Sequence, residues 1–214
     1  SNIVRFLIVD DHPLFRQGLV SVIENVRTYQ VQAQATTIAE ALSLLDKTEV
    51  DVALIDISLQ QENGLELVKT LKTSKPEVQS IVVSMYDELI YASSALKAGA
   101  RGYVMKQEAA SSLLKAIDTV LKGKIYLSDD MRERMLDTML LQESAQEIDP
   151  VELLSLREME VLRLLGQGYG VSEIGKTLNL SVKTINVYRD NIRHKLSISD
   201  AGALRKFAIK WVKS

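Results

Sequence analysis

The sequence predicts two domains: an α/β doubly wound domain with a parallel five-stranded sheet, then an all-α domain of four helices that contains a helix-turn-helix. Three observations predict this order. Short apolar runs alternate with segments of helical spacing up to residue 122, the alternation then stops, and only helical spacing follows. Continuous apolar strands that alternate with helices are typical of a parallel sheet covered on both faces.

Each expected strand of the first domain is a short apolar run, and each is followed by apolar residues at the spacing of an amphipathic helix. The strands are expected at Val4–Val9, Val31–Thr36 (an edge strand), Val52–Ile55, Ile81–Val83 and Tyr103–Met105. The helices are expected at Pro13–Glu24, Ile38–Leu45, Leu65–Leu71, Leu89–Leu96 and Ser111–Leu121. Thr36 or Thr37 is a candidate N-cap of the second helix, and Gly99 is a candidate stop of the fourth.

Residues 123–150 are expected to form a linker, partly helical, between a domain at 1–122 and a domain at 151–214. Ser128 is a candidate N-cap for a helix that runs through Leu141, and the polar segment Gln142–Pro150 is typical of a boundary. Ser155 and Glu158 have the spacing of a capping box at the start of the second domain. Its helices are expected at Leu156–Leu165, Val171–Leu178, Val182–Leu196 and Ala201–Val212.

The two domains differ in charge. Residues 151–214 hold 11 Lys or Arg and 6 Asp or Glu, a balance of +5, whereas the other 150 residues hold 15 and 22, a balance of −7. The basic domain is therefore expected to face a polyanion, although a chance partition of charge gives the same numbers.

Residue usage excludes several classes of site. The chain has no Cys and two His, which excludes disulfides, zinc fingers, thiol nucleophiles and multi-His metal sites. No run of 18 apolar residues is present, and the N-terminus lacks the order of a signal peptide. We therefore expect a cytoplasmic protein with no membrane partner.

Polar side chains follow the expected strands of the first domain. Asp10 and Asp11 follow the first strand, Asp56 the third, Ser84 the fourth and Lys106 the fifth. Ligands bind at the carboxyl ends of the strands of such sheets, so we expect these groups to converge. Crowded carboxylates stay ionised beside a cation, and Mg²⁺ prefers oxygen ligands together with a phosphate. A carboxylate held there can attack phosphorus, while the lysine and the hydroxyl bind phosphoryl oxygens.

Each of these residues alone also has an ordinary structural explanation. A carboxylate after a strand is often a helix N-cap, and Asp11 before His12-Pro13 fits that role. Ser84 could be a turn residue and Lys106 a solvated lysine. Their placement at the ends of successive strands favours a functional pocket.

Residues 3–122 resemble the receiver domain of two-component response regulators. The resemblance is carried by Val9-Asp10-Asp11-His12-Pro13, Asp56 with Gly64 eight residues on, Ser84, and Gly102-Tyr103-Val104-Met105-Lys106. It implies that Asp56 is the phosphoacceptor, and that Asp10, Asp11, Asp56 and the Ser58 carbonyl hold Mg²⁺. It also implies that Ser84 and Lys106 bind the phosphoryl group, and that Tyr103 is a switch that turns inward when Ser84 moves. Leu59-Gln60 and Asn63-Gly64 depart from the family's Met-Pro and Asp-Gly.

The pattern of the second domain predicts a helix-turn-helix around the tight turn Leu178–Ser181. Ser181 is expected to be the N-cap of Val182–Leu196. On that helix Ile185, Ile192 and Leu196 share one stripe, which is expected to be buried. Another face could enter a major groove, where Asn pairs with adenine and Val touches a thymine methyl. This face holds Lys183, Asn186, Val187 and Asp190, and Arg189, Arg193, His194 and Lys195 flank it. The alternative is a solvated amphipathic helix, and the acidic Asp190 disfavours DNA.

Residues 152–214 resemble the LuxR-type helix-turn-helix, through Leu156–Leu162, Gly166-Gln167-Gly168, Glu173-Ile174, Leu180-Ser181, Lys183-Thr184, Asn191-Ile192 and Lys195-Leu196. A receiver with this output domain is identified as a member of the NarL/FixJ class. The resemblance implies double-stranded DNA as partner, a recognition helix at Val182–Leu196, and a homodimer that uses the last helix. It places Lys183, Thr184, Asn186 and Val187 at the DNA. Tyr188 and Gly175 stand where many members have His and Ala.

The sequence therefore predicts a transcription regulator that a sensor histidine kinase phosphorylates on Asp56, that dimerises when phosphorylated and that acts with RNA polymerase. It is not predicted to be a turnover enzyme. Two alternatives stay open: a phosphorylation-independent DNA-binding protein with the receiver as dimerisation scaffold, and a phosphatase-like phosphotransfer enzyme. The glycines of Gly166–Gly170 follow a helix rather than a strand, which favours an inter-helix turn over a nucleotide loop.

Overall fold

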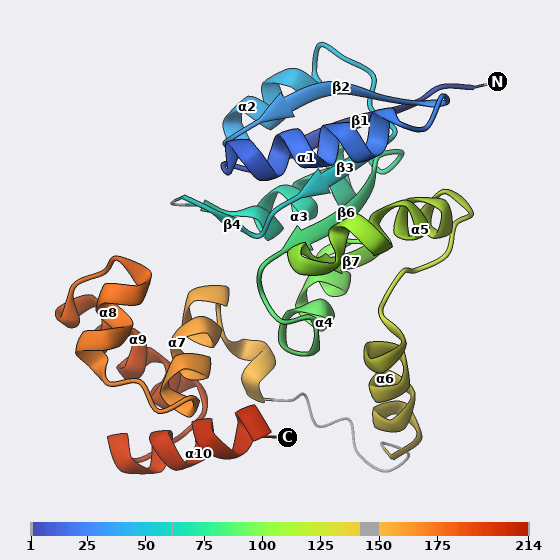
Figure 1. Cartoon of the computed structure of the whole chain (residues 1–214). Coiled ribbons are helices and arrows are strands. Elements are labelled where there is room, and N and C mark those ends of the chain that lie inside the picture. Colours follow the sequence, from blue (N-terminus) through green and yellow to red (C-terminus); the bar gives the residue numbers. More distant parts are fainter. Residues whose placement is uncertain (1, 61, 142–149, 214) are drawn as a thin grey trace. The chain divides into compact units, whose positions relative to one another are not determined.

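The computed structural model describes residues 2–60, 62–141 and 150–213. The chain forms two compact units, Ser1–Glu143 and Ser144–Ser214. Figure 1 shows the first as a sheet with helices and the second as helices alone, as the sequence predicts. Part of the polar segment expected at Gln142–Pro150 (residues 142–149) lies outside the described residues. In the described part of the chain, no helix is long and apolar enough to cross a membrane.

The first unit is built on a parallel sheet of five strands in the order β2-β1-β3-β6-β7. The strands are β1 (Val4–Val9), β2 (Tyr29–Ala35), β3 (Val52–Ile55), β6 (Gln79–Ser84) and β7 (Gly102–Met105). All pairings in this sheet are parallel, so the carboxyl ends of the strands lie at one edge. As predicted, β2 is an edge strand.

Helices cover both faces of this sheet (Figure 1). α1 (Pro13–Glu24) and α5 (Ala109–Leu121) share one apolar cluster with the strands. The other helices are α2 (Ile38–Leu45), α3 (Gly64–Ser74) and α4 (Glu88–Ala98), and a short 3₁₀ turn (Lys106–Glu108) precedes α5. Thr37, rather than Thr36, is the N-cap of α2. The N-cap of α1 is His12, with no side-chain cap, so the alternative that Asp11 caps this helix is wrong.

The loop after β3 contains a structural feature that was not predicted from the sequence. Two short strands, β4 (Ser58–Leu59) and β5 (Glu62–Asn63), pair antiparallel there. At the next residue, Gly64, an added Cβ would lie 1.9 Å from the Asp56 carbonyl oxygen. Only glycine, which has no Cβ, fits this close approach to the Asp56 carbonyl. This explains why a glycine stands eight residues after Asp56.

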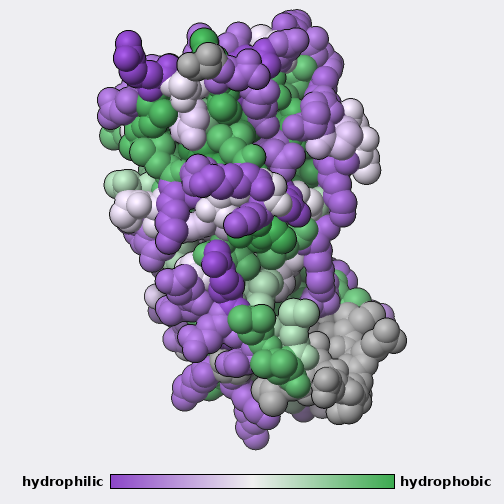
Figure 2. Space-filling view, turned by 90° about the vertical axis from the view of Figure 1, so that its right-hand side faces the viewer, coloured by the Kyte–Doolittle hydropathy of each residue, from purple (hydrophilic) through white to green (hydrophobic). Residues whose placement is uncertain are grey.

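A sixth helix, α6 (Asp129–Leu141), completes the first unit. Its start agrees with the prediction, because the Ser128 hydroxyl accepts a hydrogen bond from the Met131 N–H at 3.2 Å. Leu136, Met139 and Leu140 on this helix are exposed. Figure 2 views the protein from the side on which α5 and α6 lie in Figure 1, and shows hydrophobic areas among hydrophilic ones.

The second unit contains a 3₁₀ turn (Pro150–Leu153) and four helices. The helices are α7 (Leu156–Gly166), α8 (Val171–Leu178), α9 (Val182–Lys195) and α10 (Ala201–Lys213), each within one or two residues of its predicted bounds. Ser155 and Glu158 form the predicted capping box. Gly168 has φ +94° between α7, which ends at Gly166, and α8, whose N-cap is Gly170, so this glycine-rich segment is an inter-helix turn, as predicted.

Candidate functional site

The predicted pocket residues lie at the carboxyl edge of the sheet. Asp10 follows β1, Asp56 follows β3, Ser84 ends β6 and Lys106 follows β7. β1 pairs with β3, β3 with β6 and β6 with β7, so these four residues come from strands that are neighbours in space. All four are buried, with exposed fractions between 0% and 9%. The convergence expected from the sequence is therefore confirmed.

Three carboxylates and one ammonium group form the centre of this pocket. Lys106 Nζ lies 2.7 Å from Asp10 Oδ2 and 2.9 Å from Asp56 Oδ2. The ring of Phe15 on α1 lies 4.4 Å from the same nitrogen, a cation–π contact. Lys106 is thus a buried partner of two acids and not a solvated lysine.

His12 also belongs to this pocket, although the sequence reading assigned it no role there. Its Nδ1 lies 2.8 Å from Asp10 Oδ1, 3.1 Å from Asp11 Oδ1 and 3.7 Å from Asp56 Oδ2. Its side chain is 57% exposed, whereas that of Asp56 is 1% exposed. The imidazole therefore lies on the solvent side of the acids. Its position directly after two aspartates was the signal that could have found it.

Burial raises the pKa of Asp56 to about 6, from an ordinary value of 3.8. Desolvation is the largest cause, and the nearby Asp10 carboxylate adds to it. Lys106 and the Ser58 N–H, which donates to Asp56 Oδ1 at 3.1 Å, act in the opposite direction. The desolvation of the Asp56 carboxylate thus outweighs the stabilisation that Lys106 and the Ser58 N–H give to its charged form.

The donor set of the pocket fits a divalent cation. One ligand atom from each of Asp10, Asp11, His12 and Asp56 lies within 4.8 Å of the others. Asp10 Oδ2, Asp11 Oδ1 and Asp56 Oδ2 are buried and have no hydrogen-bond partner among the described residues, apart from ion-pair contacts. Three carboxylates with spare oxygen lone pairs are the ligands that Mg²⁺ prefers.

Ser84 and Tyr103 meet at the loop after β6. Ser84 Oγ accepts a hydrogen bond from the Tyr86 N–H at 3.1 Å, and the Tyr103 hydroxyl donates to the Tyr86 carbonyl at 2.8 Å. Tyr103 is 1% exposed, and this burial raises the pKa of its hydroxyl. The resemblance implies a tyrosine that turns inward, and in this structure Tyr103 is already inside.

The candidate recognition helix α9 separates a buried face from an exposed one. Ile185 and Ile192 are fully buried and Leu196 is partly buried, as the stripe predicts. Lys183, Asn186 and Val187 are exposed, with Val187 at 51%. Thr184 is half-buried, and its hydroxyl lies 2.9 Å from that of the N-cap Ser181. An exposed, partly apolar face of this kind suits a groove of DNA.

The cations that flank this face have partners within the second unit. Arg189 Nη1 donates to Asn186 Oδ1 at 3.1 Å, and Arg193 contacts Asp190 and donates to the Ser199 carbonyl. Lys195 Nζ lies 2.8 Å from Glu158 Oε2, a carboxylate that is 5% exposed. Lys195 therefore joins α9 to the capping box of α7, a contact that nothing in the spacing of α9 indicates.

The turn between α8 and α9 is unusually close to Gly175. An added Cβ there would lie 2.7 Å from the Leu180 carbonyl oxygen, and the Leu180 N–H donates to the Gly175 carbonyl at 2.8 Å. Asn179 takes the left-handed conformation at φ +55°, which ends α8. An alanine at position 175 would therefore force this turn to shift.

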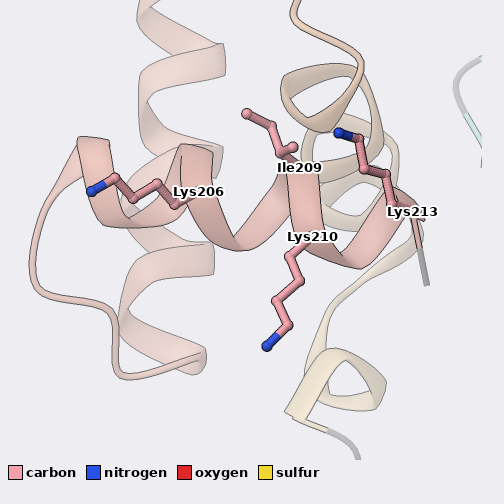
Figure 3. A pocket seen from close by; sticks show the side chains of 4 residues that line it. All are labelled: Lys206, Ile209, Lys210 and Lys213. Atoms are coloured by element: carbon pink, nitrogen blue, oxygen red, sulfur yellow. The ribbon is translucent and has the colours of Figure 1, made fainter.

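A shallow pocket on α10 is lined by Lys206, Ile209, Lys210 and Lys213. Figure 3 shows the lysine side chains pointing in different directions, so their ammonium groups do not converge on one point. The pocket offers cations without an acid or a hydroxyl, and it is therefore no candidate for catalysis.

Comparison with known proteins agrees with this arrangement. The family described as "Response regulator receiver domain" matches residues 6–118, and the family "Bacterial regulatory proteins, luxR family" matches residues 152–207. The chain is 31% identical to the transcriptional regulatory protein DegU of Brevibacillus brevis, over all of this chain and 97% of that protein. It is 32% identical to the oxygen regulatory protein NreC of Staphylococcus aureus, over 97% of each.

Solved structures give the same result. A structure of the two-component response regulator RcsB in complex with DNA is similar with a TM-score of 0.59 and 30% identity, over 96% of this chain and 98% of that one. A further structure of RcsB, from Salmonella typhimurium, gives a TM-score of 0.64 with 28% identity, over 99% of each chain. With its receiver domain and its LuxR-type helix-turn-helix, this chain belongs to the NarL/FixJ class of DNA-binding two-component response regulators.

Proposed function

We propose that a sensor histidine kinase phosphorylates this protein on Asp56, and that this controls how the basic helical domain binds double-stranded DNA. One observation carries the proposal: the Asp56 carboxylate is held between Lys106 and two further acids at the carboxyl edge of the sheet. The proposal includes three segments: a receiver at 1–122, a partly helical linker at 123–150 and a DNA-binding domain at 151–214.

The chemical step starts at Asp56 Oδ2, the oxygen that faces the pocket. This oxygen attacks the phosphorus of the donor phosphohistidine, the phosphorus–nitrogen bond breaks, and the donor imidazole leaves with a proton. Lys106 would bind a phosphoryl oxygen and the Ser84 hydroxyl would donate to another, and the 2.9 Å contact of Lys106 Nζ with Asp56 Oδ2 supports the first role. Tyr103 follows Ser84 through the shared contact with Tyr86.

Asp10, Asp11, Asp56 and the Ser58 carbonyl would hold Mg²⁺ in this pocket. When bound, Mg²⁺ supplies positive charge that offsets the crowded carboxylates and the incoming phosphoryl oxygens. The buried oxygens of the three aspartates, which have ion-pair contacts but no hydrogen-bond donor among the described residues, support this assignment.

The incoming phosphoryl group has to pass the side chain of His12 to reach Asp56. Its side chain is 1% exposed, and the half-exposed His12 ring lies on its solvent side. A rotation of His12 away from the acids opens a path for the phosphoryl group. A water molecule would later attack the phosphorus, the bond to the Asp56 oxygen would break, and phosphate would leave and regenerate the carboxylate. The protein thus acts on its own phosphoryl group and not on a separate substrate.

In the second domain, we propose that Lys183, Thr184, Asn186 and Val187 contact DNA and that Arg189, Arg193 and Lys195 reach phosphates by leaving their partners. The protein would act as a homodimer with RNA polymerase in the cytoplasm, with half-sites about 10 bp apart. The relative RcsB has been solved in complex with DNA, in one case as two dimers on two parallel DNAs, which supports this proposal.

A labelling experiment tests the proposed acceptor. The full chain is incubated with a radiolabelled small phosphodonor and Mg²⁺, and Asp56→Asn is compared with Asp46→Asn, which removes an exposed acid. We expect stoichiometric labelling of the wild type and of Asp46→Asn, and none of Asp56→Asn. Equal labelling of all three would remove Asp56 as acceptor.

A further inference from the structure

Glu88 is a buried acid that the proposed phosphoryl chemistry does not use. It lies in the first turn of α4, is 4% exposed, and its Oε1 accepts a hydrogen bond from the Ser128 N–H at 2.8 Å. Ser128 immediately precedes α6 and caps it through Met131. The Glu88 carboxylate therefore lies at the N-terminus of α6, where unpaired N–H groups and the helix dipole favour a negative charge.

The segment that leads into α6 is fixed to the edge of the sheet. The Tyr126 N–H donates to the Arg101 carbonyl at 2.9 Å, and the Tyr126 carbonyl accepts from the Tyr103 N–H at 3.1 Å. Tyr126, Leu127 and Met131 are each less than 9% exposed. The start of α6 is thus packed against β7, the strand that carries Tyr103.

One short loop connects this anchor to the phosphoryl pocket. At its start, Ser84 Oγ accepts from the Tyr86 N–H, and the Tyr86 carbonyl holds the Tyr103 hydroxyl. Two residues after Tyr86, Glu88 holds Ser128. A shift of Ser84 toward a phosphoryl group acts on the same loop whose far end holds the start of α6.

We propose that Glu88 is a clasp that couples the phosphoryl pocket to α6. The coupling rests on the proposed phosphorylation of Asp56 and adds its route: Ser84 moves, the loop through Tyr86 moves with it, and Glu88 changes its hold on Ser128. The proposed coupling ends at α6, the last helix of the first unit.

Amide-resolved NMR of the full chain tests the clasp, with and without beryllofluoride and Mg²⁺ as the phosphoryl analogue. Glu88→Ala removes the acceptor, Glu88→Gln keeps an acceptor oxygen, and Glu66→Ala is a matched control, since Glu66 is an acid in the first turn of α3 that pairs with Lys69. Without the analogue, we expect Ser128 amide exchange to rise about tenfold or more in Glu88→Ala, less in Glu88→Gln, and not in Glu66→Ala.

With the analogue, the wild type should show shifted amide signals at Ser84, Tyr103 and Ser128, and Glu88→Ala should keep the first two and lose the shift at Ser128. Unchanged Ser128 exchange in Glu88→Ala would overturn the clasp. A wild-type shift at Ser84 and Tyr103 without one at Ser128 would overturn the coupling and leave the proposed phosphorylation intact. No shift at Ser84 or Tyr103 would instead remove the proposed function, and the coupling with it.

Discussion

Lys106 and Asp56 are in direct contact inside the first domain, with Nζ 2.9 Å from Oδ2 and both side chains at most 5% exposed. The same nitrogen also serves Asp10 at 2.7 Å. One ammonium group thus faces two buried carboxylates, and Asp11 lies close by. The acids of the site carry more negative charge than Lys106 neutralises. This excess of buried negative charge lowers the free energy of unfolding, and it favours the binding of a cation.

The first prediction follows from the pKa of Asp56, which burial raises to about 6. The folded protein holds this proton more tightly than the unfolded chain, so the free energy of unfolding should fall as pH rises from about 4 to about 6. Without metal at pH 7, Asp56→Asn should stabilise the protein by up to about 3 kcal/mol, because it removes the buried charge.

Urea denaturation in the presence of a chelator measures this effect. At pH 7 the variant should unfold at higher urea than the wild type, and the difference should shrink as pH falls from about 6 to about 4, the window between the folded and unfolded pKa values of Asp56. A variant that is less stable than the wild type at pH 7 would contradict the assigned cost of the buried carboxylate.

The second prediction concerns Mg²⁺. A cation that binds only the folded state should stabilise it by about 1.4 kcal/mol at ten times its dissociation constant, since the gain grows with the logarithm of one plus the ratio of cation concentration to dissociation constant. Thermal denaturation should show a rise in Tm for the wild type and for Asp46→Asn. Asp11→Asn should respond less, and an equal response in Asp11→Asn would place the cation elsewhere.

The pocket could be predicted from sequence because its residues end strands whose apolar character fixes their place in a parallel sheet. Neighbouring strands bring Asp10, Asp56 and Lys106 together whatever the loops do. Contacts made by side chains from distant segments could not be predicted in this way. No periodicity links Glu88 to Ser128 or Lys195 to Glu158, since each pair depends on how two helices pack.

A third prediction tests the role of His12 as a cover over Asp56. His12→Ala should increase the initial rate of labelling by a small phosphodonor, because the imidazole lies on the solvent side of Asp56 Oδ2. Leu14→Ala, which shortens an 86% exposed side chain on the same helix, should leave the rate unchanged. A slower rate in His12→Ala would mean that the imidazole assists the transfer.

The fourth prediction uses the close approach at Gly64. Gly64→Ala should destabilise the protein and slow phosphorylation, because its Cβ would overlap the Asp56 carbonyl and displace the loop. Gly18→Ala is the matched control: Gly18 lies in α1 with nothing within 4 Å of an added Cβ. It should stabilise the protein by roughly 0.5–1 kcal/mol through better helix propensity. Denaturation and labelling rates of both variants decide whether the contact at Gly64 controls the acceptor loop.

The fifth prediction separates DNA contact from net charge. Lys183→Ala should weaken DNA binding by roughly 1–3 kcal/mol if the side chain reads a base, or lower the salt slope by about one if it meets a phosphate. Lys206→Ala removes the same charge from α10 and should change neither quantity much. Lys195→Ala should lower the stability of the second domain as well, because it leaves the buried Glu158 carboxylate without its ion pair. DNA titrations at several salt concentrations measure the binding free energy and the salt slope. Equal losses of DNA binding in Lys183→Ala and Lys206→Ala would show that general electrostatic attraction, and not the exposed face of α9, carries the binding.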